Sequence, residues 1–134
     1  MNALPSGSVL SFDFGLKNIG VAIGETFTGS TRTLAVLSAK QGKPQWFKID
    51  ELCQTHQPVR CVVGLPLNMD GTESPMCEAA RAFAERLHKR TKLPVDLHDE
   101  RLTSYAATDS DQNIHAESAR IILESYLAEF ASEP

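Results

Sequence analysis

The fold of this chain is decided by one stretch near its start, Ser8-Val-Leu-Ser-Phe-Asp-Phe-Gly-Leu-Lys-Asn-Ile-Gly-Val-Ala-Ile-Gly24. Two apolar runs flank a glycine, which predicts a β-hairpin, and the first run carries a single carboxylate, Asp13. Successive side chains of a strand point to opposite faces, so Asp13 lies opposite Phe12 and Phe14. Burying an unpaired carboxylate is costly. Asp13 is therefore expected at a strand end, in a cleft or beside a cation, with an ordinary exposed position as the alternative.

Length and composition indicate one globular domain. A chain of 134 residues can bury most of its apolar surface, so residues 1–134 are expected to form a single domain. No apolar run approaches the roughly 20 residues of a membrane span, and residues 1–7 lack the basic and apolar regions of a secretory signal. We therefore predict a cytoplasmic protein that does not enter a membrane.

Charge and cysteine content exclude some classes of protein. A formal net charge of -4 argues against coating nucleic acid through bulk charge, so a polyanion site must be small or assisted by a cation. The three cysteines have no CxxC spacing, which argues against a disulfide framework and a zinc cluster. Buried free thiols are expected at Cys53, Cys61 and Cys77.

Hydrophobic patterns predict the remaining elements. A third strand over 31–39, a loop over 40–44, a helix from 46 to 57 and a buried strand over 59–65 come first. A helix opening at Pro75 with Ser74 as its N-cap, a strand over 93–98, a short helix over 102–107, a loop over 108–113 and a final helix from about Ile114 follow. The result is an α/β fold: a five-stranded mixed sheet, three antiparallel strands and then βαβαβ, flanked by helices. That order resembles the ribonuclease-H-like fold.

Two acids could meet at one end of this sheet. Glu100 directly follows the predicted strand over 93–98, and α/β sheets place ligands beyond strand ends. The carboxylates of Asp13 and Glu100 would repel each other unless a divalent cation such as Mg²⁺ neutralised the pair. That arrangement predicts metal-assisted hydrolysis of a phosphodiester. Two unrelated surface acids are the alternative interpretation.

Other polar groups are candidates for contacts with phosphate. The loop over 68–74 leads into a helix N-terminus, where backbone amides can bind an anion, although a simple capped loop is the commoner case. Lys17, Arg32 and Arg101 could supply local positive charge. The cations of the helix after Pro75, among them Arg86 and Lys89, are interpreted as a solvated face, and the lone Trp46 as a core residue.

Four segments then carry a specific resemblance: SFDFGLKNIGVAIG (11–24), VVGLPLNMDGTES (62–74), HDERLTS (98–104) and IILESYL (121–127). In order and spacing they resemble the bacterial family of small Holliday-junction-resolvase-like proteins, also described as nucleases that mature the precursor of 16S ribosomal RNA. The resemblance implies a ribonuclease-H-like fold, a cytoplasmic location and a divalent-metal-dependent endonuclease using Mg²⁺ or Mn²⁺. Structured nucleic acid, either precursor ribosomal RNA or branched DNA, would be the substrate, with the ribosome as a further partner and a monomer or homodimer as the active form.

The resemblance also assigns site residues. It places the family's first two acids at Asp13 and Glu100, and His115 stands where the family has its third acid. Imidazole is an adequate ligand for Mn²⁺ but a poor one for Mg²⁺. His115 is therefore expected to bind the cation or act as a base. The alternatives are that a neighbouring acid replaces it or that the site is impaired. The neighbouring acids are Asp109, Asp111 and Glu117.

The main hypothesis is a nuclease in which Asp13, Glu100 and His115 form the catalytic metal site. In this hypothesis Lys17, Asn68, Thr72 and Arg101 contact the phosphates or other parts of the nucleic acid. A catalytically silent factor for RNA processing or ribosome assembly is the alternative from a different class. A third interpretation, the phosphate loop of actin-like ATPases, is disfavoured because one lobe of 134 residues cannot clamp ATP.

Overall fold

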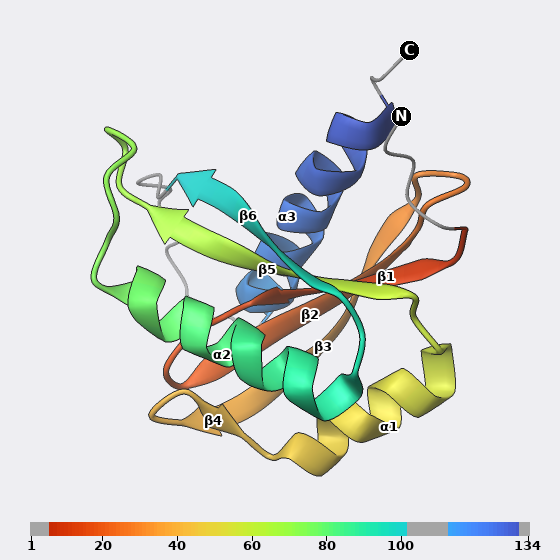
Figure 1. The fold of residues 1–134 in the computed structure, drawn as a ribbon, viewed down its shortest axis with the longest axis horizontal. Coiled ribbons are helices and arrows are strands. Elements are labelled where there is room, and N and C mark those ends of the chain that lie inside the picture. The colour runs from red at the N-terminus through yellow and green to blue at the C-terminus, as the bar shows by residue number, and fades with distance from the viewer. Residues whose placement is uncertain (1–5, 102–112, 132–134) are drawn as a thin grey trace.

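The computed structural model describes residues 6–101 and 113–131, and it is built around one curved sheet. The strands lie in the order β4-β3-β2-β1-β5-β6 (Figure 1). Their bounds are β1 Ser8–Asp13, β2 Asn18–Glu25, β3 Thr31–Lys40, β4 Lys43–Pro44, β5 Arg60–Leu67 and β6 Val95–Arg101. The helices are α1 Trp46–His56, α2 Met76–Thr91 and α3 Asn113–Ala131.

The pairing of the strands confirms the predicted mixed sheet. β1, β2 and β3 pair antiparallel in sequence order, whereas β5 pairs parallel with both β1 and β6. The sheet has six strands in place of five, because Lys43 and Pro44, predicted as loop, pair with the end of β3. The reason is the turn: Gln41 and Gly42 both have positive φ, 53° and 82°, which is the geometry of a tight hairpin.

Helices cover both faces of the sheet. α1 and α2 lie on one face and α3 crosses the other (Figure 1). On the α2 side Phe12 meets Phe83 with ring centroids 5.7 Å apart. On the α3 side Val9 packs in a second buried cluster with Ala119 and Leu123. Apolar residues of β1 thus alternate between two cores, as strand geometry requires.

Most predicted boundaries hold within a residue or two. α1 ends at His56, where Gln57 takes a left-handed conformation before Pro58. α2 begins at Met76, one residue later than predicted, and the Ser74 hydroxyl accepts the Met76 N–H at 3.3 Å. β6 runs to Arg101 instead of ending at position 98, because its parallel pairing with β5 continues to that residue. The helix predicted over 102–107 and most of the following loop lie outside the described residues.

Two other predictions concern the chain as a whole. Across residues 6–101 and 113–131, every helix is too short or too polar to cross a membrane. All three cysteines are free, with Cys61 and Cys77 buried as predicted and Cys53 half-buried.

Candidate active site

Asp13 is the last residue of β1 and stands at the carboxyl-terminal edge of the sheet. It pairs with Gly20 of β2, and it is partly exposed, unlike the five buried residues before it. Ser11, two residues earlier, donates its hydroxyl to the carbonyl oxygen of Ala119 in α3 at 2.6 Å. Side chains two positions apart in a strand share a face. Asp13 therefore lies on the face that α3 covers.

Glu100 reaches the same edge and the same face from β6. Strands β1, β5 and β6 run parallel, so their carboxyl ends meet at one side of the sheet (Figure 1). The register places Glu100 two residues beyond the level of Asp13. His98, two residues before Glu100, forms a hydrogen bond with Ser125 of α3 at 2.9 Å. The structure thus brings the two predicted acids together at the carboxyl ends of β1 and β6, on the face that α3 covers.

The pKa values of both carboxyl groups are raised. Burial raises the pKa of Asp13 to about 7, and the negative charge of Glu100 adds to the rise. Burial also raises the pKa of Glu100, while the neighbouring His98 lowers it. Among the described residues, no hydrogen-bond donor reaches the Asp13 carboxyl. Both carboxyl groups therefore resist ionisation, and Asp13 is protonated in about half of the molecules at pH 7 unless a cation takes the proton's place.

His115 lies in the first turns of α3, above the partner strand of Asp13. Its side chain is half-buried, and its carbonyl oxygen would be 1.9 Å from a Cβ built on Gly20. Gly20 is the residue paired with Asp13. Even so, the described part of the chain holds no group of three His, Cys, Asp or Glu side chains that could bind a metal ion. The structure therefore brings together two of the three predicted ligands and places the backbone of His115 over Gly20, the residue paired with Asp13.

The other candidates for the third ligand divide into two kinds. Glu117 is exposed and forms an ion pair with Arg120, whose Nε donates to the carboxylate at 2.8 Å. This pairing directs Glu117 to a neighbour on its own helix. Asp109 and Asp111 lie outside the described residues.

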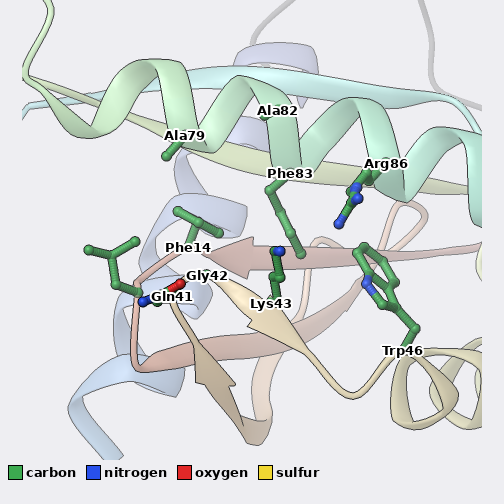
Figure 2. A pocket seen from close by; sticks show the side chains of 10 residues that line it. Phe14, Gln41, Gly42, Lys43, Trp46, Ala79, Ala82, Phe83 and Arg86 are labelled. Atoms are coloured by element: carbon green, nitrogen blue, oxygen red, sulfur yellow. The ribbon is translucent and has the colours of Figure 1, made fainter.

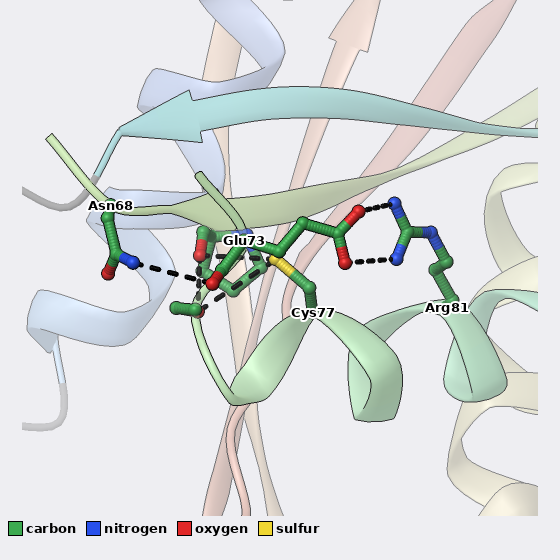
Figure 3. A network of polar contacts seen from close by, with 6 residues as sticks. Asn68, Glu73, Cys77 and Arg81 are labelled. Carbon is green, nitrogen blue, oxygen red and sulfur yellow. Dashed lines mark hydrogen bonds and ion pairs between the residues drawn. The ribbon is translucent and has the colours of Figure 1, made fainter. Parts of the chain in front are cut away.

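The loop over 68–74 is closed by its own hydrogen bonds, and Figure 3 shows the one from Asn68 to the carbonyl oxygen of Glu73. Asn68 donates from Nδ2 to the Thr72 hydroxyl at 3.0 Å, and the N–H of Thr72 donates to Asp70 at 3.0 Å. The N–H groups of Asn68 and Gly71 also bond within the loop. These amides are therefore not aimed outward at a phosphate, and Asn68 and Thr72 hold the loop in shape.

The loop is also fixed to α2. Arg81 pairs with Glu73 through both terminal nitrogens of its guanidinium group, one of them at 2.7 Å. The Cys77 thiol lies 3.4 Å from the carbonyl oxygen of Pro66, which also accepts the Ser74 hydroxyl (Figure 3). Together these contacts fix the end of β5 beside the predicted acids.

Two of the predicted cations, Lys17 and Arg101, occupy the same edge of the sheet, whereas Arg32 lies at the opposite end of β3. Lys17 is exposed in the turn between β1 and β2, and its carbonyl oxygen accepts the N–H of Ala39 at 2.8 Å. Arg101 is the last residue of β6, paired with Leu67 of β5. Both backbones thus lie close to the strand ends that carry the two acids.

Sequence reasoning missed the two glycines that shape this site. A Cβ on Gly64 of β5 would lie 2.5 Å from Ile122 of α3, and one on Gly20 would overlap the α3 backbone. Glycine inside a strand often marks the close approach of another backbone. That signal is present in the sequences of β2 and β5. Gly20 and Gly64 therefore let α3 pack closely against β2 and β5.

Comparison with known proteins gives a match over nearly the whole chain. A protein-family model described as "RuvX: Holliday junction resolvase" matches residues 7–129. Proteins named "Putative pre-16S rRNA nuclease" from Salmonella arizonae and from Escherichia coli O157:H7 are each 46% identical over 132 residues. Each of these alignments covers 90% of this chain and 96% of the relative.

Solved structures support the fold. RuvC of T. thermophilus in complex with a Holliday junction substrate aligns with a TM-score of 0.51 and 11% identity, covering 93% of this chain and 96% of that one. A second structure of Thermus thermophilus RuvC gives 0.52 and 12%, covering 93% and 97%. The predicted ribonuclease-H-like α/β fold is thereby confirmed. By sequence, this chain belongs to the RuvX family, described as Holliday junction resolvase.

Proposed function

We propose that this chain is a nuclease that hydrolyses phosphodiester bonds during maturation of the precursor of 16S ribosomal RNA. The single observation that carries the proposal is the pair of carboxylates, Asp13 and Glu100, at one edge of the sheet. Membership of the RuvX family and the names of the relatives support it. We also propose that the protein acts in the cytoplasm and that the ribosome is one of its partners.

A divalent cation, Mg²⁺ or Mn²⁺, fits the donors that this edge offers. Asp13 and Glu100 present hard oxygen atoms, and their mutual repulsion is the kind that a bound dication relieves. When bound, the cation supplies an activated water and stabilisation of the leaving oxygen. Asp13 and Glu100 would hold it, and His115 at the start of α3 is proposed as a further ligand or base.

The chain's own residues then have defined tasks. Asp13 must release its proton to act as a ligand, which its raised pKa opposes below pH 7. Lys17, exposed in the turn beside Asp13, is proposed to hold a backbone phosphate, and Arg101 to do the same from the end of β6. Asn68 and Thr72 are proposed to support nucleic-acid binding by holding the loop over 68–74 in shape.

The experiment measures cleavage with Mg²⁺ and with Mn²⁺ by purified wild-type protein and three variants. Asp13→Asn and Glu100→Gln are expected to lower the cleavage rate at least about a hundredfold, because each removes a negatively charged ligand of the proposed cation. Asp99→Asn is the matched control. Asp99 is exposed, neighbours Glu100 in β6 and interacts with Arg81 on the other face of the sheet. Its loss is expected to change the rate less than about threefold.

Two substrates separate the possible reactions. One is an RNA that carries the 5' precursor segment of 16S ribosomal RNA, and the other is a four-way DNA junction. Faster cleavage of the RNA supports the proposed role, and faster cleavage of the junction supports a resolvase instead. Undiminished cleavage by Asp13→Asn would contradict the assignment of the site.

A second candidate function is supported by one observation. The described residues supply only two of the three ligands expected for the site. A catalytically silent factor for RNA processing or ribosome assembly would bind the same RNA without cutting it. In the cleavage experiment this function predicts RNA binding that Asp13→Asn leaves unchanged and no product with either metal.

A further inference from the structure

A pocket of about 350 Å³ opens on the α2 face of the sheet, the face opposite to that of Asp13 and Glu100. This volume is at the low end of the range for small-ligand sites, about 300 to 1,000 Å³. It lies between α2, the β3–β4 hairpin and the start of α1 (Figure 2). We call it the aromatic–basic pocket after five of its lining residues, Phe14, Lys43, Trp46, Phe83 and Arg86.

Aromatic rings form one side of the aromatic–basic pocket. Trp46 stacks on Phe83 with ring centroids 5.6 Å apart and an angle of 24° between the planes. Phe14 meets Phe83 at 5.1 Å. Phe83 is buried, whereas Trp46 and Phe14 remain partly exposed at the pocket. Partly exposed aromatic faces of this kind are the surfaces on which unpaired bases stack.

Positive charge gathers at the mouth of the pocket. Lys43 and Arg86 point into the opening from opposite sides (Figure 2), and Lys89 and Arg90 extend the surface beyond Trp46. Arg90 is partly neutralised by Asp50, its partner at 2.7 Å. Among the described residues, no acid lines the pocket, and no ion pair involves Lys43, Arg86 or Lys89. In a chain with a net charge of -4, this local excess favours an anionic ligand.

The pocket is connected to the candidate active site by consecutive residues. Phe14 lines the pocket and directly follows Asp13, and Leu16 in the same turn is also part of the lining. Phe14 contacts Phe83 of α2, whereas Asp13 lies on the face that α3 covers, so the aromatic ring and the acid stand on either side of one edge. A nucleic-acid strand with one phosphate at Asp13 can therefore continue over this turn to the pocket.

We infer that the aromatic–basic pocket binds an unpaired nucleotide that flanks the bond cleaved at Asp13 and Glu100. The base stacks on Trp46 and the backbone phosphates contact Lys43 and Arg86. The inference rests on the proposed nuclease function, and it specifies a substrate with a single-stranded segment beside the cleaved bond.

The test uses the fluorescence of Trp46, the single tryptophan of the chain. A single-stranded decaribonucleotide is titrated into the full-length protein with chelator present, so that no cleavage occurs. Saturable quenching of the emission is expected. The double variant Lys43→Gln, Arg86→Gln is expected to raise the Kd about tenfold and to reduce the salt dependence by about two counterions.

Matched variants separate binding in the pocket from general charge effects. Arg32→Gln removes an exposed cation from the far end of β3 and is expected to change the Kd less than about threefold. With a fluorescently labelled oligonucleotide, Trp46→Ala is expected to raise the Kd at least about fivefold, whereas Trp46→Phe keeps a stacking ring and most of the affinity.

The outcomes distinguish this inference from the proposed function. Unchanged Trp46 emission at saturating oligonucleotide, equal quenching by a duplex, or equal Kd values for the double variant and Arg32→Gln would overturn the pocket assignment. Asp13-dependent cleavage would survive such a result. If Asp13→Asn leaves quenching intact and no variant or metal gives cleavage, the pocket stands and the nuclease proposal fails.

Discussion

At the scale of single residues, the protonation of Asp13 affects both the stability of the chain and the metal binding proposed above. Its carboxyl is held in a partly buried position beside Glu100, so its pKa rises to about 7. The folded chain without metal therefore prefers the protonated acid, although a cation requires the ionised form. The ionised form of Asp13, which the proposed cation needs, therefore lowers the stability of the folded chain when no metal is present.

This coupling predicts how stability depends on pH. The pKa of Asp13 is raised in the folded state, so unfolded chains lose the proton first as pH rises from about 4 to 7. The contribution of Asp13 to the free energy of unfolding falls through that window and is fully unfavourable above pH 7. Asp13→Asn, measured by urea unfolding without metal, is expected to be more stable than wild type at pH 8 by up to about 4 kcal/mol. The gain should nearly vanish at pH 4, and an equal difference at both pH values would contradict the account.

At the scale of elements, the position of α3 determines what the acids can reach. The helix crosses the sheet on the face of Asp13 and Glu100, with Ser11 bonded to the Ala119 carbonyl beneath it. Its first turns pass so close to β2 that only glycine fits at position 20. His115 is placed by this contact, because its own carbonyl is the atom nearest to Gly20.

Two glycine substitutions test the placement of α3. Gly20→Ala puts a Cβ within 1.9 Å of a backbone oxygen, which cannot move without shifting the helix. Gly64→Ala is the matched control, because its Cβ meets the end of the Ile122 side chain at 2.5 Å, which can turn away. Gly20→Ala is expected to lower the free energy of unfolding by about 3 kcal/mol or more and Gly64→Ala by about 1 to 2. Urea unfolding measures both, and equal losses would argue against the close contact of α3.

At the scale of the whole molecule, the parallel strands join residues that are far apart in sequence. The pairing of β1, β5 and β6 was predictable because it follows from local patterns: an alternating strand around Asp13, a buried run over 59–65 and an amphipathic crossover helix. The same register brings Glu100 to Asp13. The fold and the acid pair therefore followed from the sequence.

Other features depend on tertiary contacts that no local pattern encodes. β4 was missed because Gln41, a residue not typical of left-handed turns, has positive φ beside Gly42. Trp46 was interpreted as core and Arg86 as a solvated helix residue, and each description fits locally. Their meeting in one pocket arises only when α1, α2 and the β3–β4 hairpin come together. The hydrogen bonds that close the loop over 68–74 were likewise not visible in its residue types.

The central claim is that Asp13 and Glu100 jointly hold a divalent cation. The most direct measurement is an anomalous-difference map from crystals soaked in Mn²⁺ at pH 8, where Asp13 is ionised in most molecules. The account predicts a peak within coordination distance of both carboxylates, absent from Asp13→Asn crystals and retained in Asp99→Asn. A map with no peak between these acids, or with Mn²⁺ bound at other residues alone, would contradict it.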